Sequence, residues 1–309
     1  MDSRNQMLSG YYAFDERVFP KANLELMLSD RREDGLLSIC YPMSKSLAIP
    51  SFSLHFFTEC EEYLRYTGDK EFALRLYLRM RRLVDTFRKF ETEDGLLPPI
   101  PGEGMWNFYE WRKGLDGEDQ LHHAVCKGGE EPDLLINTLF SGALLRLESM
   151  EKMLGLPSAY DGLREKYNKA INERFFDAEL GIYRTRASST SASQLGNALA
   201  ILCGAAAGDT QTQVAQKLTQ GGLVPATLSM VGFVYDALLM TDKEKYSPLI
   251  LDTIEKTYTP MIELGNGTVW ETELGESDFS NAGSLCHGWS AIPVYYYHRI
   301  IGNTKKEIL

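Results

Sequence analysis

The sequence lacks the features that mark membrane, secreted and nucleic-acid-binding proteins. No apolar run is long enough to span a bilayer, and the first residues form neither a basic leader nor an apolar signal core. No stretch carries a run of Lys or Arg, and the formal net charge is −11 over 309 residues. Nucleic acids and anionic membranes need concentrated positive charge in a partner. We therefore expect a cytoplasmic protein that binds neither nucleic acid nor membrane.

Signals for metals and organic cofactors are also scarce. The five cysteines are odd in number and widely spaced, without a C-x-x-C pair, which predicts reduced, mostly buried thiols. His122 and His123 have no third ligand at metal spacing and lie in a polar segment that we interpret as a surface or lid loop. No phosphate-binding glycine loop follows a strand, and no G-x-S-x-G motif is present. We expect no metal and no cofactor.

Helical periodicity, by contrast, runs through most of the chain. Between Asp69 and Glu91, apolar residues recur at helical spacing with basic residues between them, so one face is apolar and the other solvated. Residues 133–155 and 191–207 are apolar or small almost all round, which predicts helices buried on every side. Buried inner helices should therefore alternate with amphipathic outer ones. We expect inner helices near 3–14, 48–66, 132–155, 191–207, 228–242 and 287–301, and outer helices near 17–31, 69–91, 157–174, 209–220 and 245–259.

Short segments that combine a glycine turn with apolar residues follow the outer helices. A helix C-terminus followed by a short extended stretch has this composition. The segments recur at roughly fifty-residue intervals, which is typical of closed or stacked arrays of helical hairpins. The pattern predicts an all-α protein, a closed (α/α)6 toroid with short strands in its loops. The five segments are DGLLSICYP from Asp34, DGLLPPIPG from Asp94, ELGIYRT from Glu179, GGLVPAT from Gly221 and NGTVWET from Asn266.

The loops that lead into the inner helices should gather at one end of the ring and form a cleft. All four tryptophans fall in these loops beside carboxylates. Trp106 and Trp111 flank one glutamate, while Trp270 and Trp289 flank an acidic loop. An indole covers the apolar face of a sugar, and carboxylates bond its hydroxyls and do acid–base work. We expect a sugar-binding cleft, although core packing is the ordinary role of a tryptophan.

Two residues of this cleft have alternative interpretations. Glu271 follows Trp270 at the end of a predicted strand, where it could project from a rigid element or be a solvated loop acid. His287 precedes Trp289 at the start of a predicted helix, where it could bond a sugar hydroxyl or satisfy the helix end. The residue spacing leaves both alternatives open.

The chain as a whole resembles a known family. The resemblance is carried by DSRNQMLSGYYAF, DGLLSICYP, WNFYEW, LINTLFSGALLRL, TVWETE and SLCHGWSAIPVYYY, of which the last two are the most specific. These segments resemble the catalytic domain of bacterial α-L-rhamnosidases, glycoside hydrolase family 78, over nearly the whole chain. The resemblance implies a six-hairpin (α/α)6 toroid that hydrolyses terminal α-L-rhamnosides with inversion, by means of two carboxyl groups.

Carried over by motif, the resemblance implies roles for individual residues. Glu271 in TVWETE matches the general base of the family, and Asp2 matches an aspartate that binds substrate near the start of the domain. The tryptophans and the histidine would line the sugar subsite. The residues expected to bind substrate are Asp2, Trp106, Glu110, Trp270, His287 and Trp289.

The general acid of the family is a glutamate several residues upstream of the position of Asp2. The resemblance therefore implies that residues 1–309 are a single toroid domain, truncated at its N-terminal edge and without accessory β-sandwich domains. Such a chain is expected to bind sugar but to hydrolyse it poorly. The toroid would also lack its twelfth helix, and the apolar seam that this exposes makes a homodimer possible.

Two other functions remain open. One is another exo-acting toroid glycosidase, such as an unsaturated uronyl hydrolase. A substrate with a carboxylate needs a basic residue in the cleft, and Arg112 and Lys113 form the only basic cluster in these loops, so a neutral deoxy sugar fits better. The other is a non-catalytic carbohydrate-binding toroid, which the absent upstream glutamate would favour.

Overall fold

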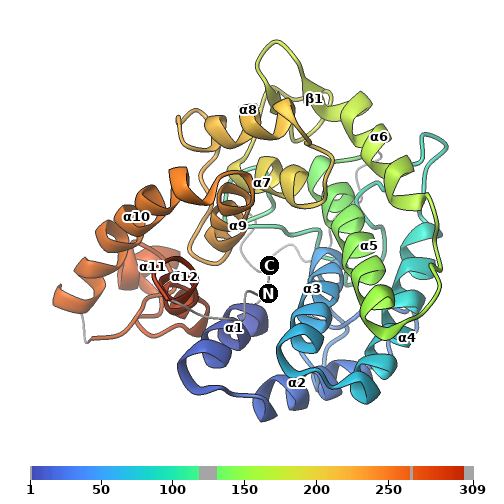
Figure 1. The fold of residues 1–309 in the computed structure, drawn as a ribbon, viewed down its shortest axis with the longest axis horizontal. Helices are drawn as coiled ribbons and strands as arrows, with labels where there is room; N and C mark the ends of the chain where they lie inside the picture. The colour runs from blue at the N-terminus through green and yellow to red at the C-terminus, as the bar shows by residue number, and fades with distance from the viewer. Residues whose placement is uncertain (1, 118–130, 265–266, 303–309) are drawn as a thin grey trace.

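The computed structural model describes residues 2–117, 131–264 and 267–302. Over these residues the helices form a ring, with one helix of each pair inside and its partner outside (Figure 1). The inner helices are α1 (Asp2–Phe14), α3 (Pro50–Thr67), α5 (Leu134–Leu154), α7 (Gln194–Leu202), α9 (Val231–Thr241) and α12 (Pro293–Ile300). The outer helices are α2 (Val18–Ser29), α4 (Lys70–Arg88), α6 (Leu163–Phe175), α8 (Asp209–Leu218) and α10 (Lys243–Leu264). Each corresponds to a helix predicted from the sequence, and the all-α toroid is confirmed.

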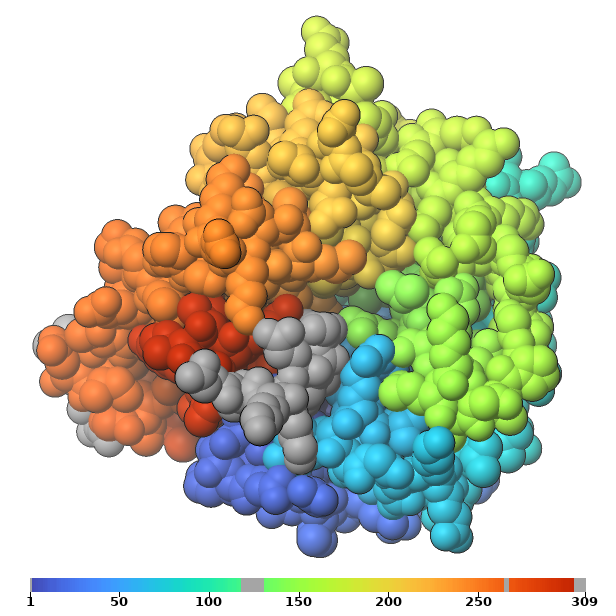
Figure 2. Space-filling model, in the orientation of Figure 1, coloured from blue at the N-terminus to red at the C-terminus, as the bar shows by residue number. Residues whose placement is uncertain are grey.

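The inner helices close on one another around the ring. Helix α3 packs on α5, α5 on α7 and α7 on α9, while α1 packs on both α3 and α12. The beginning and the end of the described chain therefore lie side by side, and Figure 2 shows the segments following one another around the molecule from blue to red. The last inner helix starts later than predicted, because Gly288–Ala291 forms a separate 3-10 helix, η2, before Pro293 opens α12.

The burial of the helices follows their predicted faces. In α4, the buried side chains recur at helical spacing from Phe72 to Phe87, and Arg75, Arg81 and Arg82 between them face solvent. In α5, every residue from Leu134 to Ser141 is buried, as an inner helix requires. Side-chain caps mark where these helices begin: Asp133 accepts a hydrogen bond from the backbone N–H of Ile136 at 3.0 Å.

Buried charges join the helices at which the ring closes. Arg4 of α1 is 1% exposed and lies 2.7 Å from Glu62 of α3 and 3.2 Å from Asp236 of α9. Arg299 of α12 lies 2.6 Å from the same aspartate, which also accepts a hydrogen bond from the hydroxyl of Tyr296. Four inner helices that are far apart in sequence therefore share one ionic cluster. The apolar periodicity gave no sign of it.

The predicted strands are mostly wrong. One of the five segments forms a named strand, β2 (Ile182–Tyr183), which pairs antiparallel with β1 (Phe176–Asp177). Elsewhere in the described residues, the extended stretches meet only at isolated bridges, between Ala48 and Met105 and between Ser193 and Val224. Each stretch forms one or two backbone hydrogen bonds with the neighbouring loop, which are too few to make a β-sheet. Asn266, at the start of the last segment, lies outside the described residues.

The cysteine prediction is only half right. The described cysteines are free, but Cys40 and Cys286 are exposed while Cys60 and Cys203 are buried. The exposed pair lies in loops of the ring rather than on helix faces, which is why apolar periodicity says nothing of their burial. Cys126, His122 and His123 lie outside the described residues. Within the ranges given above, we find no helix that combines the length and the apolar character needed to cross a bilayer.

Candidate active site

The loops that enter the inner helices are tied to one another at one end of the ring. The loop before α5 bonds the loop before α9 through Arg112, whose Nε donates to the carbonyl of Pro225 at 3.1 Å. It also meets the loop before α3, where the N–H of Trp106 donates to the carbonyl of Ala48 at 2.8 Å. The N-termini of the inner helices point at this end, and their partial positive charge favours carboxylates there.

Glu271 is held firmly in the loop between α10 and η2. Its backbone N–H donates to the carbonyl of Ser284 at 2.8 Å, and the N–H of Ser284 donates to its carboxylate at 3.0 Å. The indole N–H of Trp289 donates to its carbonyl at 2.9 Å. The predicted strand is absent, but these bonds fix the residue as a strand would. Its side chain is 19% exposed, so the carboxylate is rigid and still reachable.

His287 and Trp289 form a wall beside Glu271. Their ring centroids lie 3.9 Å apart with an interplanar angle of 30°. The Nε2 atom of His287 is 4.0 Å from the Glu271 carboxylate, and His287 is 27% exposed while Trp289 is 7% exposed. The Nδ1 atom of His287 is enclosed and has no partner among the described residues. An acid, an imidazole and an indole thus meet at one point of the loop.

The MWNFYEW segment forms an aromatic cluster. Trp106 lies 4.8 Å from Phe108 and 5.8 Å from Trp111, measured between ring centroids. Phe279 of the acidic loop meets Trp111 edge-on at 5.3 Å, which joins the two tryptophan loops. Trp106 is 7% exposed, so it serves mainly as packing for the cluster. Trp106 therefore packs in the core, as tryptophans ordinarily do, whereas Trp111 lines a cavity.

Trp270 packs against the acidic loop itself. A Cβ atom placed at Gly275, whose φ is +56°, would come within 2.9 Å of its ring. The indole nitrogen is enclosed and has no hydrogen-bond partner among the described residues. Trp270 therefore supports the turn that follows Glu271 and is only partly exposed.

Glu110 is enclosed rather than presented to the cleft. It is fully buried, and its Oε1 accepts hydrogen bonds from the N–H and the hydroxyl of Thr227 at 2.6 and 2.8 Å. Its Oε2 has no partner in the described part of the chain. Burial raises the pKa of Glu110 to about 7, although the bonds from Thr227 oppose the rise. In the structure Glu110 links two loops, and its predicted contact with a sugar stays a prediction.

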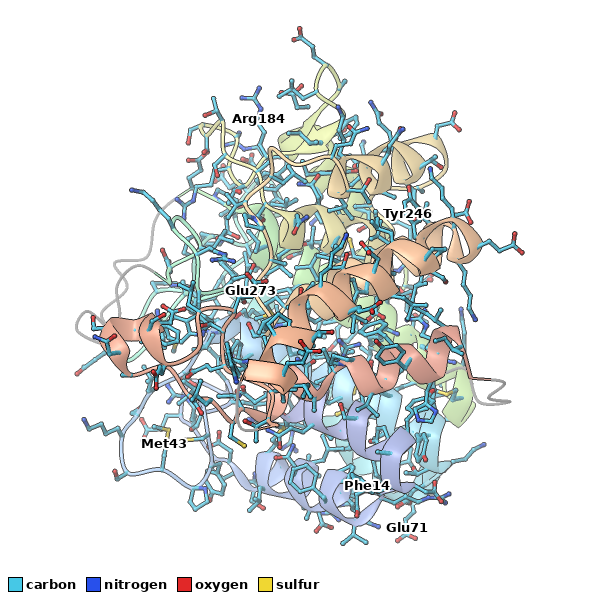
Figure 3. All side chains as sticks on the ribbon, turned by 90° about the vertical axis from the view of Figure 1, so that its left-hand side faces the viewer. Phe14, Met43, Glu71, Arg184, Tyr246 and Glu273 are labelled. Atoms are coloured by element: carbon cyan, nitrogen blue, oxygen red, sulfur yellow. The ribbon has the colours of Figure 1, made fainter. Side chains whose placement is uncertain are left out.

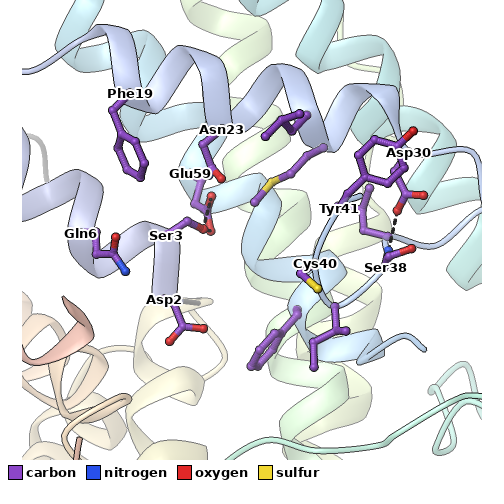
Figure 4. Close-up of a pocket in the computed structure, with 15 residues that line it drawn as sticks. Asp2, Ser3, Gln6, Phe19, Asn23, Asp30, Ser38, Cys40, Tyr41 and Glu59 are labelled. Carbon is purple, nitrogen blue, oxygen red and sulfur yellow. Dashed lines mark hydrogen bonds between the residues drawn. The ribbon is translucent and has the colours of Figure 1, made fainter. Parts of the chain in front are cut away.

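Asp2 lines a cavity of about 310 Å³ between α1, α2, α3 and the loop at Leu37 (Figure 4). Its Oδ1 atom is enclosed and has no partner within the described ranges. Gln6, on the same helix, also lines the cavity and lies against Gly288, where a Cβ atom would meet its side chain at 2.8 Å. The start of α1 is therefore next to the segment that carries His287 and Trp289.

Glu59 is a residue of this cavity that the sequence analysis missed. It is 1% exposed and accepts a hydrogen bond from the Ser3 hydroxyl at 2.9 Å. Burial raises its pKa above the ordinary value, although the Ser3 hydrogen bond opposes the rise. The available signal was an acid in the middle of FTECEEYL, on a helix otherwise predicted to be buried on all sides.

Two other cavities help to delimit the site. One of about 190 Å³ lies between the two tryptophan loops and is lined by Trp111, Arg112, Thr227 and Glu273, among others. Figure 3 shows Glu273 near the middle of the molecule, whereas Phe14 and Glu71 lie at one edge. A larger cavity of about 570 Å³ is lined by residues such as Arg65, Arg146 and Arg299 and contains none of the predicted site residues. No group of three or more potential metal ligands is found in the part of the chain that the structure describes.

The ring of helix pairs, with acids and indoles in the loops at one end, defines a six-hairpin toroid of the glycosidase type. Residues 1–301 match the bacterial alpha-L-rhamnosidase 6 hairpin glycosidase domain. The chain therefore belongs to the family of bacterial α-L-rhamnosidase six-hairpin glycosidase domains.

Solved structures are similar over most of the chain. A GH78 family rhamnosidase of Bacillus sp. GL1 has a TM-score of 0.82 at 25% identity, over 96% of this chain. A rhamnosidase from Klebsiella oxytoca with rhamnose bound has a TM-score of 0.78 at 19% identity, also over 96%, a likeness that concerns the fold alone. The chain spans 31% of the first protein and 57% of the second. No curated protein sequence matches it.

Proposed function

We propose that this chain is the sugar-binding toroid of a glycoside hydrolase that removes terminal α-L-rhamnose. The observation that carries the proposal is Glu271, a rigid and accessible carboxylate fixed by Ser284 and Trp289 beside the imidazole of His287. Family membership supports a glycosidic substrate, and the acidic character of the loops favours a neutral sugar over an anionic one.

In the proposed reaction, Glu271 acts as general base. It removes a proton from a water molecule, whose oxygen attacks the anomeric carbon from the face opposite the departing group. The bond between the anomeric carbon and the glycosidic oxygen breaks, and a carboxylic acid gives its proton to that oxygen. The motif resemblance assigns this acid to a position N-terminal to Asp2. The sugar leaves with inverted configuration.

The proposed sugar subsite lies between α1 and the loop before α12. Asp2 would accept hydrogen bonds from sugar hydroxyls, since its Oδ1 has no partner in the described residues. Trp289 and His287 would cover one face of the ring, and the apolar methyl group of a deoxy sugar suits an aromatic wall. Trp106 would support this wall through its aromatic cluster. Glu110 is not given a direct contact.

The first test is binding, measured by thermal shift and calorimetry with L-rhamnose, D-glucose, D-galacturonate and an unsaturated uronide. A ligand that binds only the folded state raises its stability by RT ln(1 + [L]/Kd), so millimolar affinities are detectable. We expect L-rhamnose alone to stabilise the chain. Equal responses to all four compounds, or none, would refute the subsite.

The second test concerns Glu271. In a form of the protein that carries the upstream acid, we expect Glu271→Gln to retain L-rhamnose binding and to reduce hydrolysis of an aryl α-L-rhamnoside by about 10²–10⁴-fold, the ordinary contribution of a general base. A variant as active as the wild type would refute the assignment. Selective L-rhamnose binding without turnover, even when the upstream segment is present, would favour a non-catalytic carbohydrate-binding toroid.

An unsaturated uronyl hydrolase remains the second candidate. Arg112 lines the cavity next to Glu273, so one basic residue faces the space between the tryptophan loops. Stabilisation by the unsaturated uronide that is lost in Arg112→Ala would favour this function over the rhamnosidase.

A further inference from the structure

Glu110 begins a series of buried hydrogen bonds between the loops at the end of the ring where the inner helices start. Its carboxylate accepts from the Thr227 hydroxyl at 2.8 Å, and that hydroxyl lies 2.9 Å from the hydroxyl of Ser229. Because the Thr227 hydrogen points at the carboxylate, Ser229 must donate to Thr227. The three residues are each at most 7% exposed, so water does not compete for these bonds.

Asn5 continues the series toward the candidate base. Its Nδ2 donates to the carbonyl of Ser229 at 3.1 Å and to the carbonyl of Trp289 at 3.2 Å. The indole N–H of Trp289 then donates to the carbonyl of Glu271 at 2.9 Å. The side-chain amide of Asn5 thus donates both of its hydrogens, one to the loop before α9 and one to the segment at Trp289, beside Glu271.

A second contact strengthens the junction at α1. The hydroxyl of Ser9 lies 2.9 Å from the carbonyl of Asn5 and 3.0 Å from the carbonyl of Ala291 in η2. Helix α1 therefore holds η2 at two points, at Trp289 and at Ala291. Segments that are separated by more than a hundred residues in the chain are positioned by the same few side chains.

We propose that Asn5, Thr227 and Glu110 are positioning residues, which place Trp289, and through it the backbone of Glu271, by this hydrogen-bonded series. The effect of these residues on catalysis rests on the proposed function. Their effect on the position of Trp289 and Glu271 does not. None of the three needs to touch the sugar. Their role is to keep the base and the aromatic wall in one arrangement.

The physical reason is the precision that acid–base chemistry requires. A displacement of about 1 Å in a reacting group can reduce the rate by about 10²-fold. Glu271 has no helix or strand of its own to hold it, so its place depends on bonds from Ser284 and Trp289. Trp289 in turn depends on Asn5, since its carbonyl lies in a 3-10 turn rather than in a regular helix.

The variants Thr227→Val and Asn5→Ala test the proposal. Valine keeps the shape of threonine, but its side chain cannot bond Glu110 or Ser229, and only the backbone N–H of residue 227 still donates to Glu110. Thr227→Ser keeps the hydroxyl. Asn168→Ala is a matched control: this asparagine is also buried and also bonds side chain and backbone, through Ser141 and the carbonyl of Cys203, but on the outer helix α6. Figure 1 shows α6 on the far side of the ring from α12.

The first readout is independent of function. Hydrogen exchange should increase in the peptides that cover residues 268–291 in Thr227→Val and Asn5→Ala. The loop in which the N–H of Glu271 bonds Ser284 and the N–H of His287 bonds Val269 is then held less firmly at Trp289. We expect Thr227→Ser to stay closer to the wild type than Thr227→Val. In Asn168→Ala, the increase should be confined to α6 and its neighbours. Unchanged exchange over residues 268–291 in both Thr227→Val and Asn5→Ala would overturn the proposal.

The second readout uses turnover of an aryl α-L-rhamnoside, measured with each variant in a form of the protein that carries the upstream acid. In Thr227→Val and Asn5→Ala we expect kcat to fall about tenfold or more with KM nearly unchanged, since the base is misplaced while the sugar contacts persist. Asn168→Ala should lose thermal stability but keep kcat. An equal loss of kcat in Asn168→Ala would show that general destabilisation is responsible and would overturn the proposal. If the wild type neither binds L-rhamnose nor turns over, the proposed function fails, and the exchange experiment still decides on the positioning residues.

Discussion

At Glu110, two physical effects oppose each other. Burial favours the neutral carboxyl group, while the two hydrogen bonds from Thr227 and the charge of Arg112 favour the carboxylate. Burial prevails and raises the pKa to about 7. An acid of this kind in a cleft is often catalytic. Here both oxygens are enclosed, so we assign it a positioning role instead.

The pH dependence of stability follows from this pKa. Between the unfolded pKa of about 4.3 and the folded pKa of about 7, the native state binds more protons than the unfolded state, so stability falls as the pH rises. In Glu110→Gln this contribution is absent. We expect the difference in unfolding free energy between wild type and variant to change by up to roughly 1.4 kcal/mol per pH unit across that window.

Urea denaturation at several pH values from 4.5 to 8 measures this difference. Glu59, Glu62 and Asp133, whose pKa values burial also raises, are present in both proteins and cancel in the comparison. A difference that does not vary with pH would mean that Glu110 is ionised throughout the range.

At the scale of elements, the helix starts were readable from the sequence and the loop strands were not. A cap is a local interaction: Asp69 directly precedes α4, and its side chain accepts from the N–H of Phe72. A strand needs a partner elsewhere in the chain. The segment that ends in Glu271 looked like a strand, but its partner at Ser284 to His287 offers only scattered bonds.

The N-cap side chains also differ in the number of hydrogen bonds that they accept. Asp133 accepts from the N–H of Ile136 and, at 2.7 Å, from the hydroxyl of Tyr109. Among the residues that the structure describes, Ser193 accepts only from the N–H of Gly196. We expect Ser193→Ala to cost about 1 kcal/mol of stability and Asp133→Ala to cost about 2–3 kcal/mol, because the second change also leaves a buried hydroxyl without a partner. Chemical denaturation measures the loss of unfolding free energy in each variant. Equal losses would mean that the hydrogen bond from Tyr109 to Asp133 adds no net stability beyond the cost of burying the two groups.

At the scale of the molecule, the ring is closed by charge as well as by apolar packing. Arg4 is the centre of the ionic cluster, and its removal leaves Glu62 and Asp236 in a low-dielectric interior with less compensation. We expect Arg4→Met to destabilise the fold by about 3–5 kcal/mol. Arg164→Met is the control, because its ion pairs with Glu148 and Glu165 lie nearer the surface and should contribute at most about 1 kcal/mol. Thermal unfolding measures the stability that each variant loses. Similar losses in Arg4→Met and Arg164→Met would contradict a special role for the ionic cluster.

Exposed apolar residues lie near the ends of the first and last inner helices. Phe14 is 81% exposed, Val18 78%, Tyr297 41% and Ile301 65%. Contacts of Tyr12 with Tyr295 and His298 hold these helices together. The homodimer expected from an apolar seam at this place stays a prediction.

The sequence by itself determined the helices, their alternation and the residues around Glu271. Apolar periodicity depends on neighbours three or four positions away, and motifs are short, so both are visible in a single chain. The family resemblance reached the same toroid by a separate route. Tertiary structure alone decided that Glu110 is enclosed by Thr227, that Glu59 lines the Asp2 cavity, and that Arg4 joins Glu62 to Asp236. Each of these depends on the burial and pairing of polar groups from segments that are distant in sequence, and the free energy of such a group is set by its surroundings in space rather than by its neighbours along the chain.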